Sequence, residues 1–304
     1  MKSLIISNLK NIMKEADAFI RKNRKLEIRS KEGNGNLVTS VDIKLNEYIT
    51  HKLNEIYPEA EIISEEMQNI GQKNSSLKFV IDPIDGTSNF LKGWPCSVSI
   101  GAIFKEELVA GMILDINSRD VYYATKNGGA YRYNLSNSNK IIKININKSK
   151  INDIQKAIVS YDFPYSDVAF DNTQKVVASL YRNGAKLKTI GPISLEILKC
   201  GLGKNNRQND YNDVCFHLEV RPWDVAAATC IIRELGFELY SLKNNATPID
   251  INELVDKEAT IAFVATNSEI LATHIYNEYN HVVYEYDKQF VEVTKKAKCA
   301  REKI

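Results

Sequence analysis

The stretch Val80-Ile81-Asp82-Pro83-Ile84-Asp85-Gly86-Thr87-Ser88-Asn89-Phe90 decides how the rest of the chain is interpreted. The apolar residues before Asp82 predict a buried strand, and Pro83 predicts its end, because proline lacks the N–H that a strand needs. The small residues after Asp85 predict the start of a helix, where N–H groups without partners attract phosphate. The stretch therefore predicts two carboxylates beside an anion-binding turn.

This combination suits magnesium-assisted attack on a phosphate ester. Mg²⁺ prefers hard oxygen ligands and is usually held by a few carboxylates together with phosphate oxygens and water. The same short pattern, Asp-x-x-Asp-Gly, is also compatible with an ordinary turn that contains one capping carboxylate. Other parts of the chain have to decide between the two interpretations.

Three more segments place acidic residues near the ends of predicted elements. Thr39 is a good N-cap for an amphipathic helix, and Asp42 falls in the first turn of that helix. Farther along, a short strand ends in Glu65 and Glu66, of which only one can face a site because neighbouring strand residues point in opposite directions. Asp224 opens another helix. Each carboxylate has a simple structural explanation as well as a functional one.

The order of predicted elements divides the chain into two parts. Two predicted hairpins, residues 98–114 and 121–133, indicate an antiparallel sheet, whereas strands and helices alternate after a polar segment that extends through Asp153. That alternation includes a helix expected over 172–183. We therefore expect an α+β subdomain over 1–145, an α/β subdomain over 146–286 and a basic tail over 287–304.

Composition excludes several classes of protein. Forty basic and 38 acidic residues leave a net charge of +2, which is too balanced to indicate nucleic-acid binding through a global field. The chain contains no apolar run near the roughly 20 residues of a membrane helix and no signal-peptide pattern at its start. The five cysteines form no Cys-x-x-Cys pair, which favours reduced thiols. We expect a cytoplasmic protein without membrane or nucleic-acid partners.

The residues from Asp82 to Phe90 resemble the signature of the inositol monophosphatase family of Mg²⁺-dependent, lithium-sensitive phosphatases. Three further segments are similar to other motifs of that family in the expected order: Leu37 to Asp42, Ile63 to Glu66 and Trp223 to Ala227. The resemblance extends from about residue 4 to about residue 280. It implies a layered αβαβα sandwich of the inositol monophosphatase and fructose-1,6-bisphosphatase type, with two subdomains, and a homodimer.

The resemblance also implies roles for individual residues. Two or three Mg²⁺ ions would be held by Glu65, Asp82, the carbonyl of Ile84, Asp85 and Asp224, with Lys31 a candidate contact of a third ion. The catalytic residues would be Asp42, Glu65 and Thr87, in which Asp42 orients the Thr87 hydroxyl to receive a proton from the attacking water. The residues implied to bind substrate are Asp85, Gly86, Thr87, Gly191, His217, Glu219 and Arg221.

The implied activity is hydrolysis of a small phosphate monoester, most directly inositol 1-phosphate, by metal-activated water. Two departures from the family leave the substrate open. Pro192 stands where members usually carry a small, often hydroxylated residue, and His217 stands where inositol-specific members place a glutamate.

Several alternatives follow from these departures. Glu219 shares a strand face with His217 and can take over the role of the missing glutamate, or His217 and Arg221 can recognise a different polyol or a second anionic group. A purely structural histidine is equally compatible. Alternative substrates are fructose 1,6-bisphosphate, NADP and 3′-phosphoadenosine 5′-phosphate. The alternative from another class is a noncatalytic protein that keeps the fold to bind a partner or RNA.

Overall fold

The computed structural model describes residues 1–23, 27–30, 37–146, 150–202 and 211–283. Lys31, the polar segment expected over 204–210 and the basic tail over 287–304 lie outside the described residues.

The first half of the chain forms an eight-stranded sheet with the strand order β10-β9-β8-β7-β6-β5-β3-β4. Most neighbouring strands are antiparallel, as the predicted hairpins require, and only β3 and β5 run parallel. The bounds of these strands are β3 (Glu61–Ser64), β4 (Ile70–Gly71), β5 (Leu77–Asp85), β6 (Ser97–Phe104), β7 (Glu107–Asp115), β8 (Asp120–Thr125), β9 (Gly129–Asn134) and β10 (Asn137–Lys143).

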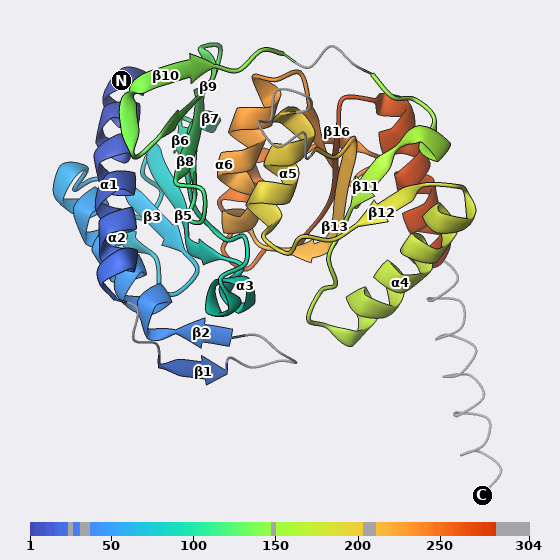
Figure 1. The fold of residues 1–304 in the computed structure, drawn as a ribbon, viewed down its shortest axis with the longest axis horizontal. Coiled ribbons are helices and arrows are strands. Elements are labelled where there is room, and N and C mark those ends of the chain that lie inside the picture. Colours follow the sequence, from blue (N-terminus) through green and yellow to red (C-terminus); the bar gives the residue numbers. More distant parts are fainter. Residues whose placement is uncertain (24–26, 31–36, 147–149, 203–210, 284–304) are drawn as a thin grey trace, which may run out of the picture.

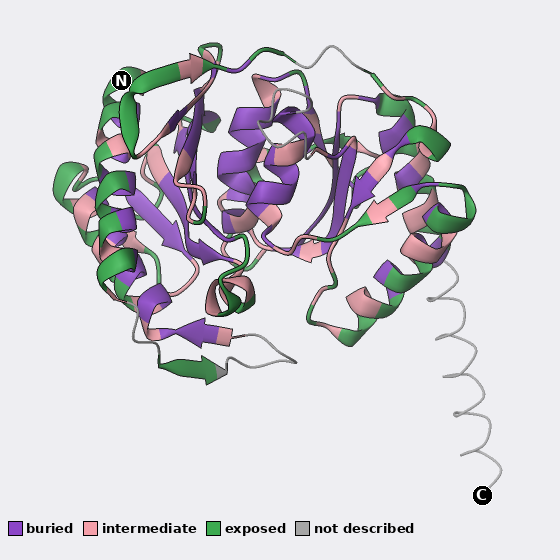
Figure 2. Ribbon diagram, in the orientation of Figure 1, coloured by how far each residue is buried: buried purple, intermediate pink, exposed green. Residues whose placement is uncertain are grey.

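Two long helices, α1 (Lys2–Lys22) and α2 (Ser40–Ile56), cover the outer face of this sheet (Figure 1). Their apolar residues recur at helical spacing, so that one stripe of each helix packs on the sheet and the other stripe faces solvent (Figure 2). A small hairpin, β1 (Ile28–Ser30) and β2 (Leu37–Thr39), precedes α2, and a short helix, α3 (Thr87–Lys92), follows β5.

The second half forms a six-stranded mixed sheet with the order β12-β11-β13-β16-β14-β15. A 3-10 turn, η1 (Ile154–Lys156), leads into it, and another, η3 (Ile251–Leu254), lies between β15 and β16. Its outer face is covered by α4 (Asp167–Arg182) and by a helix over described residues 269–283 (Figure 1). The strands are β11 (Ile158–Ser160), β12 (Lys186–Lys188), β13 (Val214–Val220), β14 (Glu238–Ser241), β15 (Thr247–Pro248) and β16 (Ile261–Thr266).

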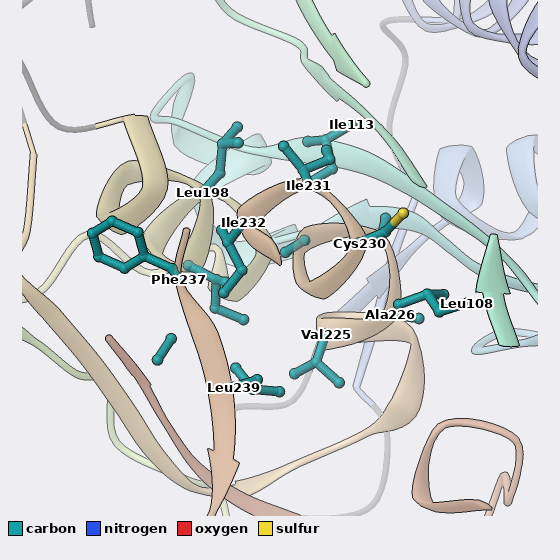
Figure 3. Close-up of a cluster of buried hydrophobic side chains, with 14 of the residues drawn as sticks. Leu108, Ile113, Leu198, Val225, Ala226, Cys230, Ile231, Ile232, Phe237 and Leu239 are labelled. Carbon is teal, nitrogen blue, oxygen red and sulfur yellow. The ribbon is translucent and has the colours of Figure 1, made fainter. Parts of the chain in front are cut away.

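Between the two sheets lies a layer of two helices, α5 (Ile193–Leu202) and α6 (Pro222–Arg233), which are buried almost all round (Figures 1 and 2). The close-up in Figure 3 shows Ile231 and Ile232 of α6 among apolar side chains from both sheets, such as Ile113 and Leu239. The five layers give the αβαβα sandwich, so the predicted fold class is confirmed.

The inner helix α6 approaches the first sheet very closely because two glycines face it. A Cβ atom at Gly111 would lie 2.4 Å from the Ala227 carbonyl oxygen, and one at Gly101 would lie 2.9 Å from the Ala226 Cβ. We call this contact, formed by Gly101, Gly111, Ala226 and Ala227, the glycine–alanine seam. It fixes the separation of α6 from the strands that carry the acidic residues.

Three sequence-based expectations differ from the structure. The strand that was expected to end at Asp82 continues to Asp85, because its pairing with β6 is irregular between these residues and the irregularity accommodates Pro83. The helix expected over 172–183 begins at Asp167, since Ser166 provides an N-cap. The polar segment after residue 134 is not only a linker, because β10 adds an edge strand to the first sheet.

Candidate active site

The predicted site residues gather at one cleft of about 630 Å³, a volume typical of ligand pockets. Asp42 does not line the cleft itself but contacts Thr87, which does. Glu66, the neighbour of Glu65, is absent from the lining, as alternation along a strand requires. The predicted residues that line the cleft are Glu65, Asp82, Ile84, Asp85, Gly86, Thr87, Gly191, His217, Glu219, Arg221 and Asp224.

The acidic group in this cleft comes from both halves of the chain. Oxygen atoms of Asp82, Asp85 and Asp224 lie within 4.8 Å of one another. Asp82 and Asp85 belong to β5, whereas Asp224 stands in the first turn of α6, where one of its oxygens accepts a hydrogen bond from the Arg221 N–H at 2.7 Å. Glu65 follows directly after β3, which is the parallel neighbour of β5.

The electrostatics of this group favour a bound cation. Burial, together with Glu65, Asp85 and Asp224, raises the pKa of Asp82 well above its usual range. Burial and neighbouring carboxylates raise the pKa of Asp224 in the same way. Among the described residues, no group donates a hydrogen bond to the buried Oδ1 of Asp82. A divalent cation with oxygen ligands would supply that partner and offset the repulsion, so the residues present fit Mg²⁺.

Asp85 connects the two halves of the molecule. Its oxygens accept hydrogen bonds from the N–H groups of Ile193 and Ser194, at 3.0 and 2.7 Å, and from the Ser97 hydroxyl at 3.3 Å. The hydroxyls of Ser97 and Ser194 are also 2.8 Å apart. Burial raises the pKa of Asp85 to about 6, although these hydrogen bonds lower it. Sequence reasoning missed both serines, since only the fold brings them to Asp85.

Thr87 and Asp42 form the hydrogen bond that the resemblance implies. The Thr87 hydroxyl donates to Oδ1 of Asp42 at 2.9 Å, and Oδ2 of Asp42 accepts from the Thr39 N–H at 2.9 Å and from the Thr39 hydroxyl. Thr39 and Asp42 thereby form a capping box at the start of α2. Burial raises the pKa of Asp42, and the hydrogen bonds from Thr39 and Thr87 lower it.

The turn between β5 and α3 requires a glycine. Gly86 has a φ of 88°, and a Cβ atom there would lie 3.2 Å from the Cβ of Pro192. Pro192, one of the two departures from the family, thus packs directly on this turn.

At another wall of the cleft, the predicted substrate residues already have partners within the protein. Oε2 of Glu219 accepts from the Ser166 hydroxyl at 2.6 Å and from the Ser166 N–H at 3.3 Å. One guanidinium nitrogen of Arg221 donates to the carbonyl of Glu258 at 3.0 Å. Their roles in substrate binding stay predictions.

His217 is 3% exposed and forms an ion pair that the sequence did not indicate. Burial lowers the pKa of His217, but Cys215 and Glu196 raise it, and the result is about 10. The ring is therefore protonated at neutral pH, and its Nε2 donates to Oε2 of Glu196 at 3.1 Å. Oε1 of Glu196 accepts from the Ile190 N–H at 2.6 Å and the Gly191 N–H at 3.1 Å. The pair thus holds the Gly191 turn in place.

Mg²⁺ is predicted to stabilise the folded protein most strongly at neutral and higher pH. The pKa of Asp85 is raised from 3.8 to about 6 in the folded state, so its contribution to stability is complete below about pH 4 and is lost as the pH rises through about 6. The raised pKa of His217 acts in the same direction between 6.5 and about 10. We expect the melting temperature without metal to fall between about pH 5 and about pH 8, and saturating Mg²⁺ to raise it by about 5 °C or more at pH 8.

The measurement is calorimetry at constant ionic strength, with NaCl in place of MgCl₂ as the control for screening. A smaller effect of Mg²⁺ is expected near pH 5, where protons compete for the carboxylates. A melting temperature at pH 8 that does not respond to Mg²⁺ would contradict the metal assignment.

Comparisons with known proteins agree with this geometry. The sequence model described as "Inositol monophosphatase family" matches residues 4–284. The chain is 30% identical over 209 residues to the Nus factor SuhB of Vibrio cholerae, covering 68% of this chain and 72% of that protein. No helix among the described residues has the length and apolar character needed to cross a membrane.

Two solved structures share the fold. One is an IMPase of Thermotoga maritima, with a TM-score of 0.74, 21% identity and coverage of 94% of this chain and 99% of that chain. The other is an IMPase/NADP phosphatase complexed with NADP and Ca²⁺, with a TM-score of 0.73, 20% identity and coverage of 90% and 95%.

Proposed function

The chain belongs to the inositol monophosphatase family, and we propose that it is a Mg²⁺-dependent phosphatase that hydrolyses a small phosphate monoester. The observation that carries the proposal is the environment of Asp82. This buried carboxylate has an oxygen without a hydrogen-bond donor among the described residues, and it lies among other acids in a cleft beside the Gly86 turn. Such an arrangement is costly without a cation, which makes a purely structural role a poor explanation.

The residues of the cleft divide the work of hydrolysis. Two or three Mg²⁺ ions held by Glu65, Asp82, the Ile84 carbonyl, Asp85 and Asp224 would supply Lewis acidity and a water of lowered pKa. The Thr87 hydroxyl donates to Asp42, so its lone pairs can accept a hydrogen bond from the attacking water and align it. Glu65 is the second group that receives the proton. The N–H groups of Gly86 and Thr87 hold the phosphate oxygens.

The substrate that we propose is inositol 1-phosphate, with an alternative phosphate ester of the same family second. The cleft is large enough for a phosphorylated polyol, sugar or nucleotide. One structural neighbour is complexed with NADP, which keeps NADP, and with it 3′-phosphoadenosine 5′-phosphate, among the alternatives, as is fructose 1,6-bisphosphate. A homodimer is part of the proposal as well.

A second candidate function is a noncatalytic role in binding a partner or RNA. The relative that carries the name Nus factor SuhB favours it, because that name does not describe a phosphatase. Such a role would not require the buried carboxylates of the cleft or the contact between Thr87 and Asp42.

Release of inorganic phosphate tests the proposal. The purified protein is incubated with inositol 1-phosphate, fructose 1,6-bisphosphate, NADP and 3′-phosphoadenosine 5′-phosphate, with Mg²⁺ present or chelated. We expect release that requires Mg²⁺, is fastest for inositol 1-phosphate and is inhibited by about millimolar Li⁺, since a small cation competes at a site of hard oxygen ligands. Absence of release from all four esters would shift the conclusion to the noncatalytic function.

A further inference from the structure

We propose that Asp162 selects the leaving group of the substrate by accepting hydrogen bonds from its hydroxyl groups. The inference rests on the proposed phosphatase function and makes it more specific. It assigns the substrate to the phosphate esters of polyhydroxylated alcohols, and it places the selecting carboxylate at a position that the sequence had not indicated.

The position of Asp162 follows from the pairing of two parallel strands. Ser160 of β11 pairs with Cys215 of β13, so Asp162 and His217, each two residues farther along, emerge at the same edge of the sheet. Both line the cleft. The family places a glutamate where this chain has His217, and the structure brings a carboxylate to the same wall from the neighbouring strand.

The carboxylate of Asp162 is held so that one oxygen is available. Its Oδ1 accepts from the Phe163 N–H at 2.8 Å and from the Thr189 hydroxyl at 3.4 Å. No described residue donates a hydrogen bond to its Oδ2, and the side chain is only half-buried in the cleft wall. A substrate hydroxyl can therefore donate to an oxygen whose position is already fixed.

The other two acids at this wall are not available for the same task. Oε2 of Glu219 accepts from both the hydroxyl and the N–H of Ser166. Glu196 is fully buried, and its two oxygens are bound to His217 and to the Gly191 turn. Asp162 is thus the acid of this wall that has an oxygen left for substrate.

Neighbouring charges favour the ionised form of Asp162 in a specific way. Burial raises the pKa of Asp162, whereas the charge of His217 lowers it and Glu196 raises it. His217 itself has its Nε2 bound to Glu196, so its contribution at this wall is positive charge beside the carboxylate. The carboxylate of Asp162, rather than the imidazole, then contacts the hydroxyl groups.

The test compares two esters that differ only in hydroxyl groups on the ring: inositol 1-phosphate and cyclohexyl phosphate. In Asp162→Asn, the amide oxygen keeps the bonds to Phe163 and Thr189, and an NH₂ group replaces the accepting Oδ2. We expect the KM for inositol 1-phosphate to rise about tenfold or more at unchanged kcat, because a hydrogen bond to a charged acceptor is lost. The KM for cyclohexyl phosphate should change by less than about twofold.

Asp167→Asn is the matched control, because it removes the same charge from an exposed position on α4 and should leave both esters unaffected. An equal loss on both esters would overturn the proposal and assign Asp162 to the architecture of the cleft. An unchanged KM for inositol 1-phosphate would overturn it too, as would a wild-type preference for cyclohexyl phosphate. If the wild type hydrolyses neither ester, the proposed function fails first and this inference fails with it.

Discussion

Replacing Asp82 by asparagine is expected to lower kcat/KM by about 10³-fold or more and, in the absence of metal, to raise the melting temperature. Loss of a ligand that bridges the proposed ions removes several kcal/mol of charge stabilisation in the transition state, and about 1.4 kcal/mol corresponds to a factor of ten. The same change removes a buried charge that Glu65, Asp85 and Asp224 repel, which lowers the cost of folding without metal. The measurements are phosphate release with Mg²⁺ and calorimetry without it.

The opposite signs of the two effects separate a metal ligand from a structural carboxylate. Asp213→Asn is the matched control: this half-buried aspartate also has a pKa raised by burial, but it lies outside the cleft, where it accepts from the Ile158 N–H. Asp85→Asn is a less clean choice, because an amide NH₂ would face the N–H groups of Ile193 and Ser194. Wild-type turnover in a folded Asp82→Asn protein would refute the assignment of Asp82.

Thr87→Val is expected to reduce kcat by about 10²-fold to 10⁴-fold with little change in KM, the range typical of lost general acid–base catalysis. Valine keeps the shape of threonine but can neither donate to Asp42 nor accept a hydrogen bond from water. The comparison is made by steady-state kinetics with inositol 1-phosphate. Thr87→Ser, which keeps the hydroxyl, should retain most of the activity.

The choice of Thr87 rather than Asp42 matters because Asp42 has two tasks. Its Oδ2 closes the capping box with Thr39, so that Asp42→Asn would weaken the start of α2 as well as the pair with Thr87. An equal loss in Thr87→Ser and Thr87→Val would assign the effect to packing. A rise in KM without a fall in kcat would move Thr87 from proton transfer to phosphate binding.

Local sequence patterns were sufficient for much of this architecture. The N-cap at Thr39, the glycine turn after Asp85 and the two hairpins of the first sheet depend on residues close together in the chain, and the structure contains all of them. The resemblance of the segment from Asp82 to Phe90 supplied the order of the layers. Pro83 misled the analysis, because proline forbids a regular ladder but not an irregular one.

Contacts between distant residues could not be read in the same way. The bond from Ser194 to Asp85 joins residues that are 109 positions apart, and the pairs of Glu196 with His217 and of Ser166 with Glu219 depend on how α5, β13 and α4 pack. Asp162 left one usable signal. It follows closely after a strand, as Glu65 and Asp224 also do, and acids at strand ends are frequent components of sites in sheets with helical layers.

The glycine–alanine seam has a consequence for how this sequence can change over evolutionary time. Asp224 is carried by α6, and α6 lies where it does because Gly111 leaves no side chain between its strand and Ala227. A single added methyl group in the interior would push the helix away and widen the span between Asp224 and Asp82. Natural selection for turnover therefore acts on interior residues that touch neither metal nor substrate, and their variation among descendants of this sequence is limited by catalysis as well as by folding.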